Sequence, residues 1–257
     1  MAFQFDNQSS KDFKLYSYLS TWQLIPAGTS NTLSIPGRDG VLVLVSKLGA
    51  REIKLICGFI PQKSSIQMGQ KLDEIAGWLS CDKGLRKLVI SEFPDRYYLA
   101  RIASSVDFTR ELRTMGTFEL SFFCPDPYGY AIDDEILTIT EPGSYRLTRK
   151  LGNTSSSPLI LVDADFPENT RPTMQLKIND EVLNLSGIWP PNSTLVLDTL
   201  HQTAKFISPT GETIGNAMPA LERPVFPKFQ MGDNYIELTG ERLSLREVKI
   251  KAQSRWR

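Results

Sequence analysis

The sequence contains one histidine, His201, and three cysteines without a C-x-x-C pair, so it offers little to the common metal and nucleophile sites. A Ser-His-Asp triad would depend wholly on His201, which follows Asp198 near the end of a predicted strand, and no G-x-S-x-G occurs elsewhere. An odd number of widely spaced cysteines disfavours both a disulfide framework and a zinc site. We expect His201 to lie in an exposed turn, and we expect buried thiols at Cys57, Cys81 and Cys124.

An excess of charge of either sign is also absent, because Lys and Arg number 29 and Asp and Glu number 29. Zero formal net charge argues against nucleic-acid binding by a generally basic surface, and low self-repulsion suits a subunit that packs against copies of itself. One face of the last predicted strand is nevertheless basic, with Lys249, Lys251, Arg255 and Arg257. We interpret this face as solvated or as part of a protein interface, with nucleic-acid contact as the alternative.

Motifs for phosphate and calcium binding are missing or incomplete. Neither G-x-x-x-x-G-K-[ST] nor G-x-G-x-x-G is present. Asp163 and Asp165, followed by Glu168 and Asn169, resemble a calcium loop, but Pro167 stands at its fifth position and its sixth position is not glycine. A calcium site of another geometry and a carboxylate pair for glycoside hydrolysis remain alternatives, because such pairs need closeness in space and not in sequence. We expect no catalytic residue, no metal and no cofactor.

Long hydrophobic runs are absent as well. The longest aliphatic run, Val41 to Val45, is far shorter than the about 20 residues that a membrane-spanning helix needs. The first residues, Met1 to Asp6, have neither the basic region nor the apolar region of a secretory signal. We expect Val41 to Val45 to form a buried strand, and we expect the chain to remain in the compartment where it is made.

The strongest strand signal in the chain lies between Gly116 and Tyr130. Apolar residues alternate along it at Phe118, Leu120, Phe122 and Cys124. Pro125 and Pro127 then end the strand, because proline cannot donate to a sheet ladder. The sequence therefore predicts the last strand of one domain here, followed by a rigid turn that leads to the next domain.

Two further strands and one helix are predicted in the first half. Arg51 to Phe59 alternates as a half-buried strand, and Tyr98 to Phe108 alternates as a long hairpin arm or a sheet spine. Ser64 and Gln67 form a capping box at the start of a helix that Gly84 is expected to end. Met68 and Trp78 on this helix predict core packing, and a partner-binding stripe is the alternative.

Beyond Tyr130 the sequence changes to short strand signals separated by turns about every 8–12 residues, which is typical of a β-sandwich. Residues 174–178 and 182–185 predict a hairpin around Asn179-Asp180. We therefore predict a mainly β protein of two domains, residues 1–135 and 136–257. The first is an α+β domain, a β-sandwich or barrel with one helix and a long hairpin, and the second is a β-sandwich.

Several stretches, taken in order, resemble the distal tail protein family, often called Dit, of phages with long non-contractile tails. In the first half these stretches are Pro36-Gly-Arg-Asp-Gly40, Arg51-Glu-Ile-Lys-Leu55, Ile75-Ala-Gly-Trp-Leu79, Phe93-Pro-Asp-Arg-Tyr-Tyr98 and Gly116 to Tyr128. In the second half they are Gly152-Asn-Thr with Pro158-Leu, Leu195-Val-Leu-Asp198, Phe229-x-x-Gly-Asp-Asn234 and Arg255-Trp-Arg257. The ordered combination covers nearly the whole chain and is more specific than any one stretch.

The resemblance implies that six copies form a ring through the first domain, and that the second domain is a galectin-like or carbohydrate-binding-module-like jelly roll. Such a protein is a hub at the tip of the tail, made in the host cytoplasm and not an enzyme. It joins the tail tube and tape-measure protein to a tail-associated lysin or receptor-binding protein. DNA passes through its channel as cargo.

Ring contacts are expected at the Tyr98–Phe108 strand and at a hairpin from Val41 to Phe59, because unpaired strand edges can pair between subunits. The candidate interface residues are Leu55, Tyr98, Ile102 and Val106. The main alternative function is a carbohydrate-binding module that attaches to host cell-wall glycans through the second domain. Its candidate aromatic platform is Trp189 and Tyr235, although Trp189 in a loop can also be a packing residue.

Overall fold

The structure is a computed structural model that describes residues 2–59, 61–80, 82, 84–103, 106–112, 115–166, 172–242 and 244–257. The chain forms two compact units, residues 1–132 together with Arg257, and residues 133–256. The division after Ile132 lies three residues before the end of the first predicted domain. Among the described residues, no helix is long and apolar enough to span a membrane.

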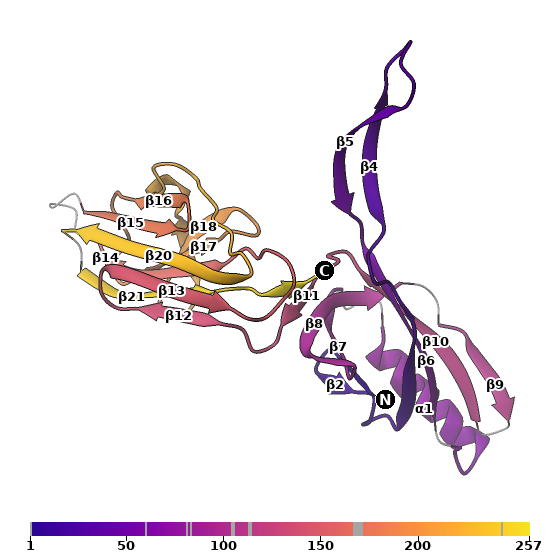
Figure 1. Ribbon diagram of the computed structural model, residues 1–257. Coiled ribbons are helices and arrows are strands. Elements are labelled where there is room, and N and C mark those ends of the chain that lie inside the picture. Colours follow the sequence, from indigo (N-terminus) through magenta and orange to yellow (C-terminus); the bar gives the residue numbers. More distant parts are fainter. Residues whose placement is uncertain are drawn as a thin grey trace. The chain divides into compact units, whose positions relative to one another are not determined.

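The first unit is a mainly antiparallel sheet with one α-helix (Figure 1). Its elements are β1 (Phe3–Phe5), β2 (Gln8–Ser9), β3 (Leu15–Trp22), β4 (Gly28–Ser34), β5 (Val41–Leu48), β6 (Arg51–Phe59), α1 (Ser65–Trp78), β7 (Arg86–Ile90), β8 (Phe93–Ile102), β9 (Phe108–Leu112), β10 (Met115–Cys124) and β11 (Gly129–Ala131). The strand order is β2-β1-β7-β8-β10-β6-β3, with β9 paired to β10 and β11 paired to β8. The described strands thus form an open sheet and not a closed barrel.

The strand predicted from Gly116 is β10, the centre of this sheet. It pairs with β6 from Thr117 opposite Gly58 to Cys124 opposite Arg51. Its alternation is confirmed, because the buried positions are Phe118, Leu120, Phe122 and Cys124. Gly116 itself must be glycine, since a Cβ there would overlap the Phe108 ring and the Thr109 carbonyl of β9.

Helix α1 packs on the sheet and completes the core of the first unit. The predicted cap is confirmed, because the Ser64 hydroxyl accepts a hydrogen bond from the Gln67 amide at 3.2 Å. Trp78 is buried, stacks on Phe13 at a centroid distance of 4.3 Å, and donates its indole N–H to the Phe5 carbonyl. Met68 is buried too, so the partner-binding stripe is wrong and core packing holds. The helix ends at Trp78, six residues before Gly84.

Two strand predictions in the first unit are wrong. The Tyr98–Phe108 strand is divided, because β8 ends at Ile102 and β9 begins at Phe108. The hairpin from Val41 to Phe59 does not form either, because β5 pairs with β4 while β6 lies between β3 and β10. Strands β4 and β5 instead make a separate two-stranded sheet, which we call the arm, residues 28–48. It extends beyond the sheet in Figure 1.

The second unit is a β-sandwich, as the strand spacing predicts. Its elements are β12 (Ile136–Ile139), β13 (Gly143–Arg149), β14 (Leu159–Asp165), β15 (Thr173–Ile178), β16 (Glu181–Leu185), β17 (Thr194–Asp198), β18 (Thr203–Ile207), β19 (Thr213–Asn216), η3 (Met218–Ala220), β20 (Gly232–Glu241), β21 (Ser244–Lys251) and β22 (Arg255–Trp256). One sheet has the order β12-β21-β14-β17-β18-β19 and the other the order β13-β20-β15-β16. The predicted hairpin is confirmed as β15–β16.

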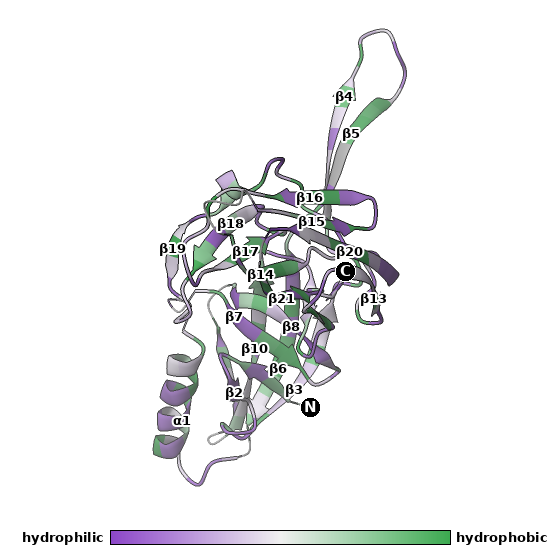
Figure 2. Ribbon diagram, turned by 90° about the vertical axis from the view of Figure 1, so that its left-hand side faces the viewer, coloured by the Kyte–Doolittle hydropathy of each residue, from purple (hydrophilic) through white to green (hydrophobic). Residues whose placement is uncertain are grey.

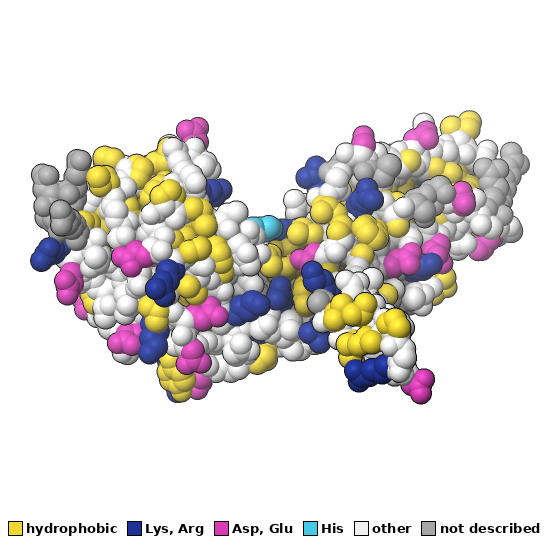
Figure 3. Space-filling model, turned by 90° about the horizontal axis from the view of Figure 1, so that it is seen from above, with side chains coloured by type: hydrophobic (Ala, Val, Ile, Leu, Met, Phe, Trp, Pro, Cys, Tyr) yellow, Lys and Arg dark blue, Asp and Glu magenta, His cyan; other side chains and the backbone are white. Residues whose placement is uncertain are grey.

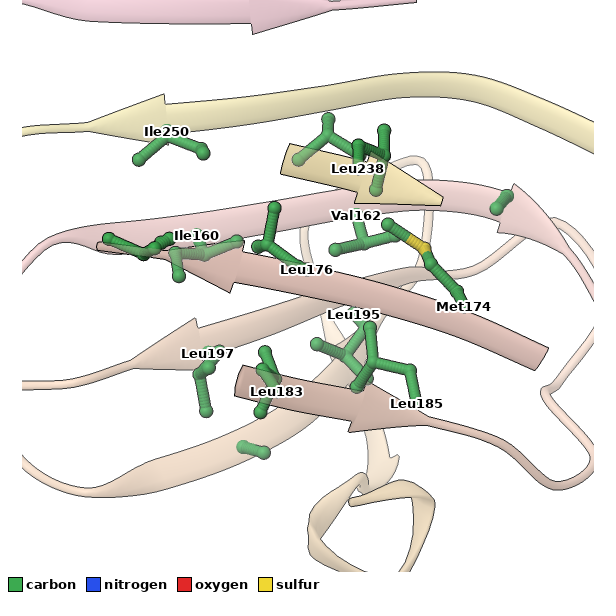
Figure 4. Packing of buried hydrophobic residues seen from close by; sticks show 14 of the residues in the cluster. Ile160, Val162, Met174, Leu176, Leu183, Leu185, Leu195, Leu197, Leu238 and Ile250 are labelled. Atoms are coloured by element: carbon green, nitrogen blue, oxygen red, sulfur yellow. The ribbon is translucent and has the colours of Figure 1, made fainter. Parts of the chain in front are cut away.

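The core of the sandwich forms between the two sheets. Inward-facing residues of one sheet include Ile160, Val162, Leu195, Leu197 and Ile250, and those of the other include Met174, Leu176, Leu183, Leu185 and Leu238 (Figure 4). Apolar side chains from both inner faces interdigitate, which is how a sandwich buries the alternating positions of its strands. The last strands follow this rule, with Val248 and Ile250 buried and Lys249 and Lys251 partly exposed.

Candidate assembly interface

The arm exposes apolar side chains on both of its faces. Cross-strand pairing places Leu33 opposite Leu42, and it places Val41 and Val43 opposite Ser34 and Thr32 on the other face. Val41 and Val43 are 59% and 62% exposed, although a strand that is apolar on both sides is typical of a buried position. The prediction of a buried strand at Val41–Val45 is therefore wrong for its described side chains, which are exposed. Figure 2 shows a green, hydrophobic stretch on β5, in the arm that extends away from the sheet. Figure 3 shows yellow hydrophobic side chains at the surface among charged ones.

The base of the arm is held by close backbone contacts. Gly49 donates its N–H to the Ala27 carbonyl at 2.6 Å, which joins the chain leaving the arm to the chain entering it. A Cβ on Gly49 would lie 2.8 Å from that carbonyl oxygen, so a larger residue would push the two segments apart. The arm is therefore inserted between β3 and β6, and its two connecting segments are held close together at its base.

A buried arginine fixes this base to the turn that follows β10. Arg51 donates from Nε to the Pro127 carbonyl at 2.8 Å and from Nη1 to the Gln23 carbonyl at 2.6 Å. Its guanidinium also lies 4.8 Å from the Trp22 ring centroid. Burial lowers the pKa of Arg51 from its ordinary value. Arg51 thus links the arm and the exit turn through one side chain.

Sequence reasoning missed this role, although a signal for it exists. Arg51 is in phase with Ile53, Leu55, Cys57 and Phe59, the buried face of β6. A cation at a core-facing position must find acceptors, because an uncompensated buried charge is costly. The same turn is stabilised by Asp126, whose carboxylate accepts the Tyr128 amide at 3.1 Å and the Tyr130 hydroxyl at 2.5 Å. The rigid turn predicted after Cys124 is therefore present.

Three of the four candidate ring residues lie in the core of the first unit. Leu55, Tyr98 and Ile102 are buried, whereas Val106 is 37% exposed. Strand β6 has no free edge, since it pairs with β10 on one side and β3 on the other. A proline at Leu55 would consequently disrupt the central sheet rather than an outer edge. Exposed apolar side chains of the first unit lie instead on the arm, and also outside it at Leu24, Ile25 and Ile66.

The two residues of the predicted glycan platform are separated. Trp189 is buried and stacks on Phe166, with ring centroids 3.9 Å apart and an interplanar angle of 4°. The platform prediction is wrong for Trp189, and loop packing holds. Tyr235 lies on β20 and is 63% exposed, on the outer face of the four-stranded sheet.

The other candidate chemical groups are occupied by neighbours. His201 Nδ1 lies 2.8 Å from the Asp198 carboxylate in an exposed turn. Arg246 binds the two aspartates of the stretch that resembles a calcium loop, at 2.7 Å from Asp163 Oδ1 and 2.6 Å from Asp165 Oδ2. Glu168 and Asn169 lie outside the described residues.

The cysteines whose structure is described are buried and unpaired. Burial raises the pKa of the Cys57 and Cys124 thiols to about 12, so they remain protonated near neutral pH. Cys81 lies outside the described residues. Within the described part of the chain, no three His, Cys, Asp or Glu side chains come together as a metal site.

Comparison with known proteins agrees with this architecture. Residues 9–124 match the family model described as the phage tail protein RIFT-related domain. No curated protein matches the chain. The structure of the Dit protein of phage SPP1, described as a paradigm of the hub adsorption apparatus in phages that infect Gram-positive bacteria, is similar with a TM-score of 0.71 and 17% identity. The match covers 99% of this chain and 98% of that one.

A structure of the phage P2 baseplate in its activated conformation with Ca is also similar, with a TM-score of 0.50, 12% identity and 98% of both chains covered. A second P2 baseplate structure, with Sr, gives a TM-score of 0.52 at 12% identity and 97% coverage of both chains. These matches confirm the resemblance that the ordered motifs indicate. Residues 9–124 are thus similar to the phage tail protein RIFT-related domain, and the whole chain has the fold of the SPP1 distal tail protein.

Proposed function

We propose that this chain is a structural hub at the tip of a long non-contractile phage tail, where six copies close into a ring through the first unit. The observation that carries the proposal is the arm, whose apolar residues have no cover from their own chain in the described structure. The RIFT-related domain and the fold shared with hub and baseplate proteins support the same role.

We infer a ring because the proposed contact joins two different surfaces of neighbouring copies. The arm is a projecting element, and we propose that its counterpart on the next copy is a different surface, because such heterologous contacts form rings when the rotation closes. Covering the arm removes apolar side chains from water, which favours association at about 25 cal/mol for each Å² buried. A contact of this kind stabilises the assembly without changing the fold of each copy.

The partners that we infer lie on the two sides of the ring. The tail tube and the tape-measure protein contact one side, and a tail-associated lysin or receptor-binding protein contacts the other. DNA passes through the channel as cargo only. The hub is part of the virion tail tip and is assembled in the host cytoplasm, and we assign it no enzymatic step.

The test is the mass and shape of the purified full chain. Light scattering after size exclusion should give six times the 28.9 kDa of one chain, and negative-stain images should give six-fold rings. A stable monomer at micromolar concentration, without other tail proteins, would contradict ring formation by this chain alone.

A second candidate function is glycan binding by the sandwich, which we propose to be galectin-like. A shallow cavity of about 630 Å³ lies on the outer face of the four-stranded sheet, lined in part by Gln175, Asn184, Glu237 and Thr239. The Gln175 amide donates to Asn184 at 2.9 Å, and amides and hydroxyls of this kind can bind sugar hydroxyls. Tyr235 lies beside Glu237 in a neighbouring cavity and offers an exposed ring.

Titration of the full chain with host cell-wall polysaccharide tests this candidate. Tyr235→Ala is expected to weaken binding about fivefold, because loss of one stacking contact removes about 1 kcal/mol. The matched control is Tyr145→Phe, which keeps the ring on the adjacent strand β13. Equal affinity for Tyr235→Ala and the parent chain would exclude Tyr235 as the platform.

A further inference from the structure

The first unit contains an apolar groove that is separate from the arm. It lies between α1 and the sheet, has a volume of about 460 Å³, and is lined in part by Leu72, Ile75, Ala76, Leu79, Val106 and Phe108. Ala76 and Val106 are exposed at its rim, while Ile75 and Leu79 form its buried floor. An exposed apolar depression of this kind is a docking surface when a matching apolar element exists.

We propose that the arm of one copy occupies this groove on the next copy in the ring. The leucine face of the arm, Leu33 and Leu42, supplies the apolar side chains, since both residues are exposed and lie directly opposite each other on the paired strands. This proposal rests on the ring of the proposed function and names the surface that receives the arm.

We infer a second copy as the occupant, because the arm, in the described part of the chain, does not cover the groove of its own copy. Strands β4 and β5 pair only with each other among the described strands, and Leu33, Leu42 and Val43 remain exposed. Each copy carries this arm and this groove, so a head-to-tail contact uses both once per subunit and leaves neither open in a closed ring. A closed ring of identical subunits requires as many arms as grooves.

The charges at the two surfaces are complementary as well. The charged residue in the groove lining is Asp73. The described arm carries Arg38 and Lys47 against Asp39, which leaves one positive charge in excess. Opposite charges at the edge of an apolar contact help to fix its register and exclude the reverse orientation.

Cross-linking of the full chain tests the contact. Leu42→Cys and Ala76→Cys are combined in a Cys81→Ser background and treated with a short bismaleimide. The native Cys57 and Cys124 thiols are buried and should not react. The expected product is a ladder of covalent multimers up to six chains, at least tenfold more abundant than in the matched pair Leu42→Cys with Gln70→Cys. Gln70 is an exposed α1 residue outside the groove lining.

The possible outcomes distinguish failure of the groove proposal from failure of the ring proposal. Six-fold rings in images without a ladder above the Gln70 control would overturn the groove proposal and leave the ring intact. Cross-linked monomers alone would mean that the arm folds onto its own groove, which also overturns the proposal. A parent chain that forms no rings would overturn both the ring and the contact.

Discussion

Replacing Val41 and Val43 with aspartate is expected to convert the six-fold rings into monomers that remain folded. Both side chains are largely exposed, so the substitutions remove no core contact from the isolated chain. The leucine face of the arm enters the groove, and in the ring we expect the opposite, valine face to be covered as well. The substitutions would then place two carboxylates in an apolar contact, at a cost of about 3 kcal/mol or more. Such a loss weakens association by more than about a hundredfold.

Light scattering after size exclusion measures the mass, and thermal unfolding followed by circular dichroism measures the fold. The matched control is Ile136→Asp with Ile214→Asp, two exposed aliphatic residues on edge strands of the second unit. This control should keep its rings. Rings that persist in the Val41 and Val43 variant would show that the valine face of the arm lies outside the ring contact.

Arg51→Met is expected to destabilise the first unit by about 3 kcal/mol and to lower its melting temperature by about 10 °C. The substitution removes two charge-assisted hydrogen bonds and leaves the carbonyls of Gln23 and Pro127 without these donors. Part of the cost is recovered, because the buried guanidinium no longer has to be desolvated. The remaining loss of stability reflects weaker attachment of both the base of the arm and the exit turn.

Urea unfolding measures this effect, with two transitions analysed separately because the chain has two units. The matched control is Lys54→Met on the same strand. Lys54 points to the other face of the sheet and lies 3.8 Å from Glu52 and Glu119, a distance at which partly exposed ion pairs contribute little. If both variants lose the same stability, the buried hydrogen bonds of Arg51 are not what holds the turn.

Several elements follow from local pattern alone. The alternation of β6 and β10, the cap at Ser64 and the β15–β16 hairpin were all predictable, because their signals are carried by residues a few positions apart. The sandwich class of the second unit could be predicted for the same reason. Short strands at regular spacing with turn residues between them have few other ways to bury their apolar sides.

The arm is a feature that the local sequence pattern does not predict. Val41 to Leu44 has the composition of a central buried strand, yet its side chains are exposed. An apolar strand pattern indicates that the strand is covered, but it does not indicate whether the same chain or another chain covers it. Pairing partners are equally undetermined, since β5 could pair with β6 across two residues but pairs with β4 instead. Trp189 shows the opposite outcome, since a loop tryptophan that could have been an exposed platform is instead a core residue. Its stacking on Phe166 establishes this.

Four features could be predicted from the sequence: the mainly β class, the helix start, the turn after Cys124 and the resemblance to distal tail proteins. These features depend on neighbouring residues or on ordered motifs. The burial of Leu55, Tyr98 and Ile102 in the first unit and the exposure of the arm could be seen only in the folded chain. The physical reason is that burial depends on which distant segments meet, and the periodicity of one strand does not contain that information.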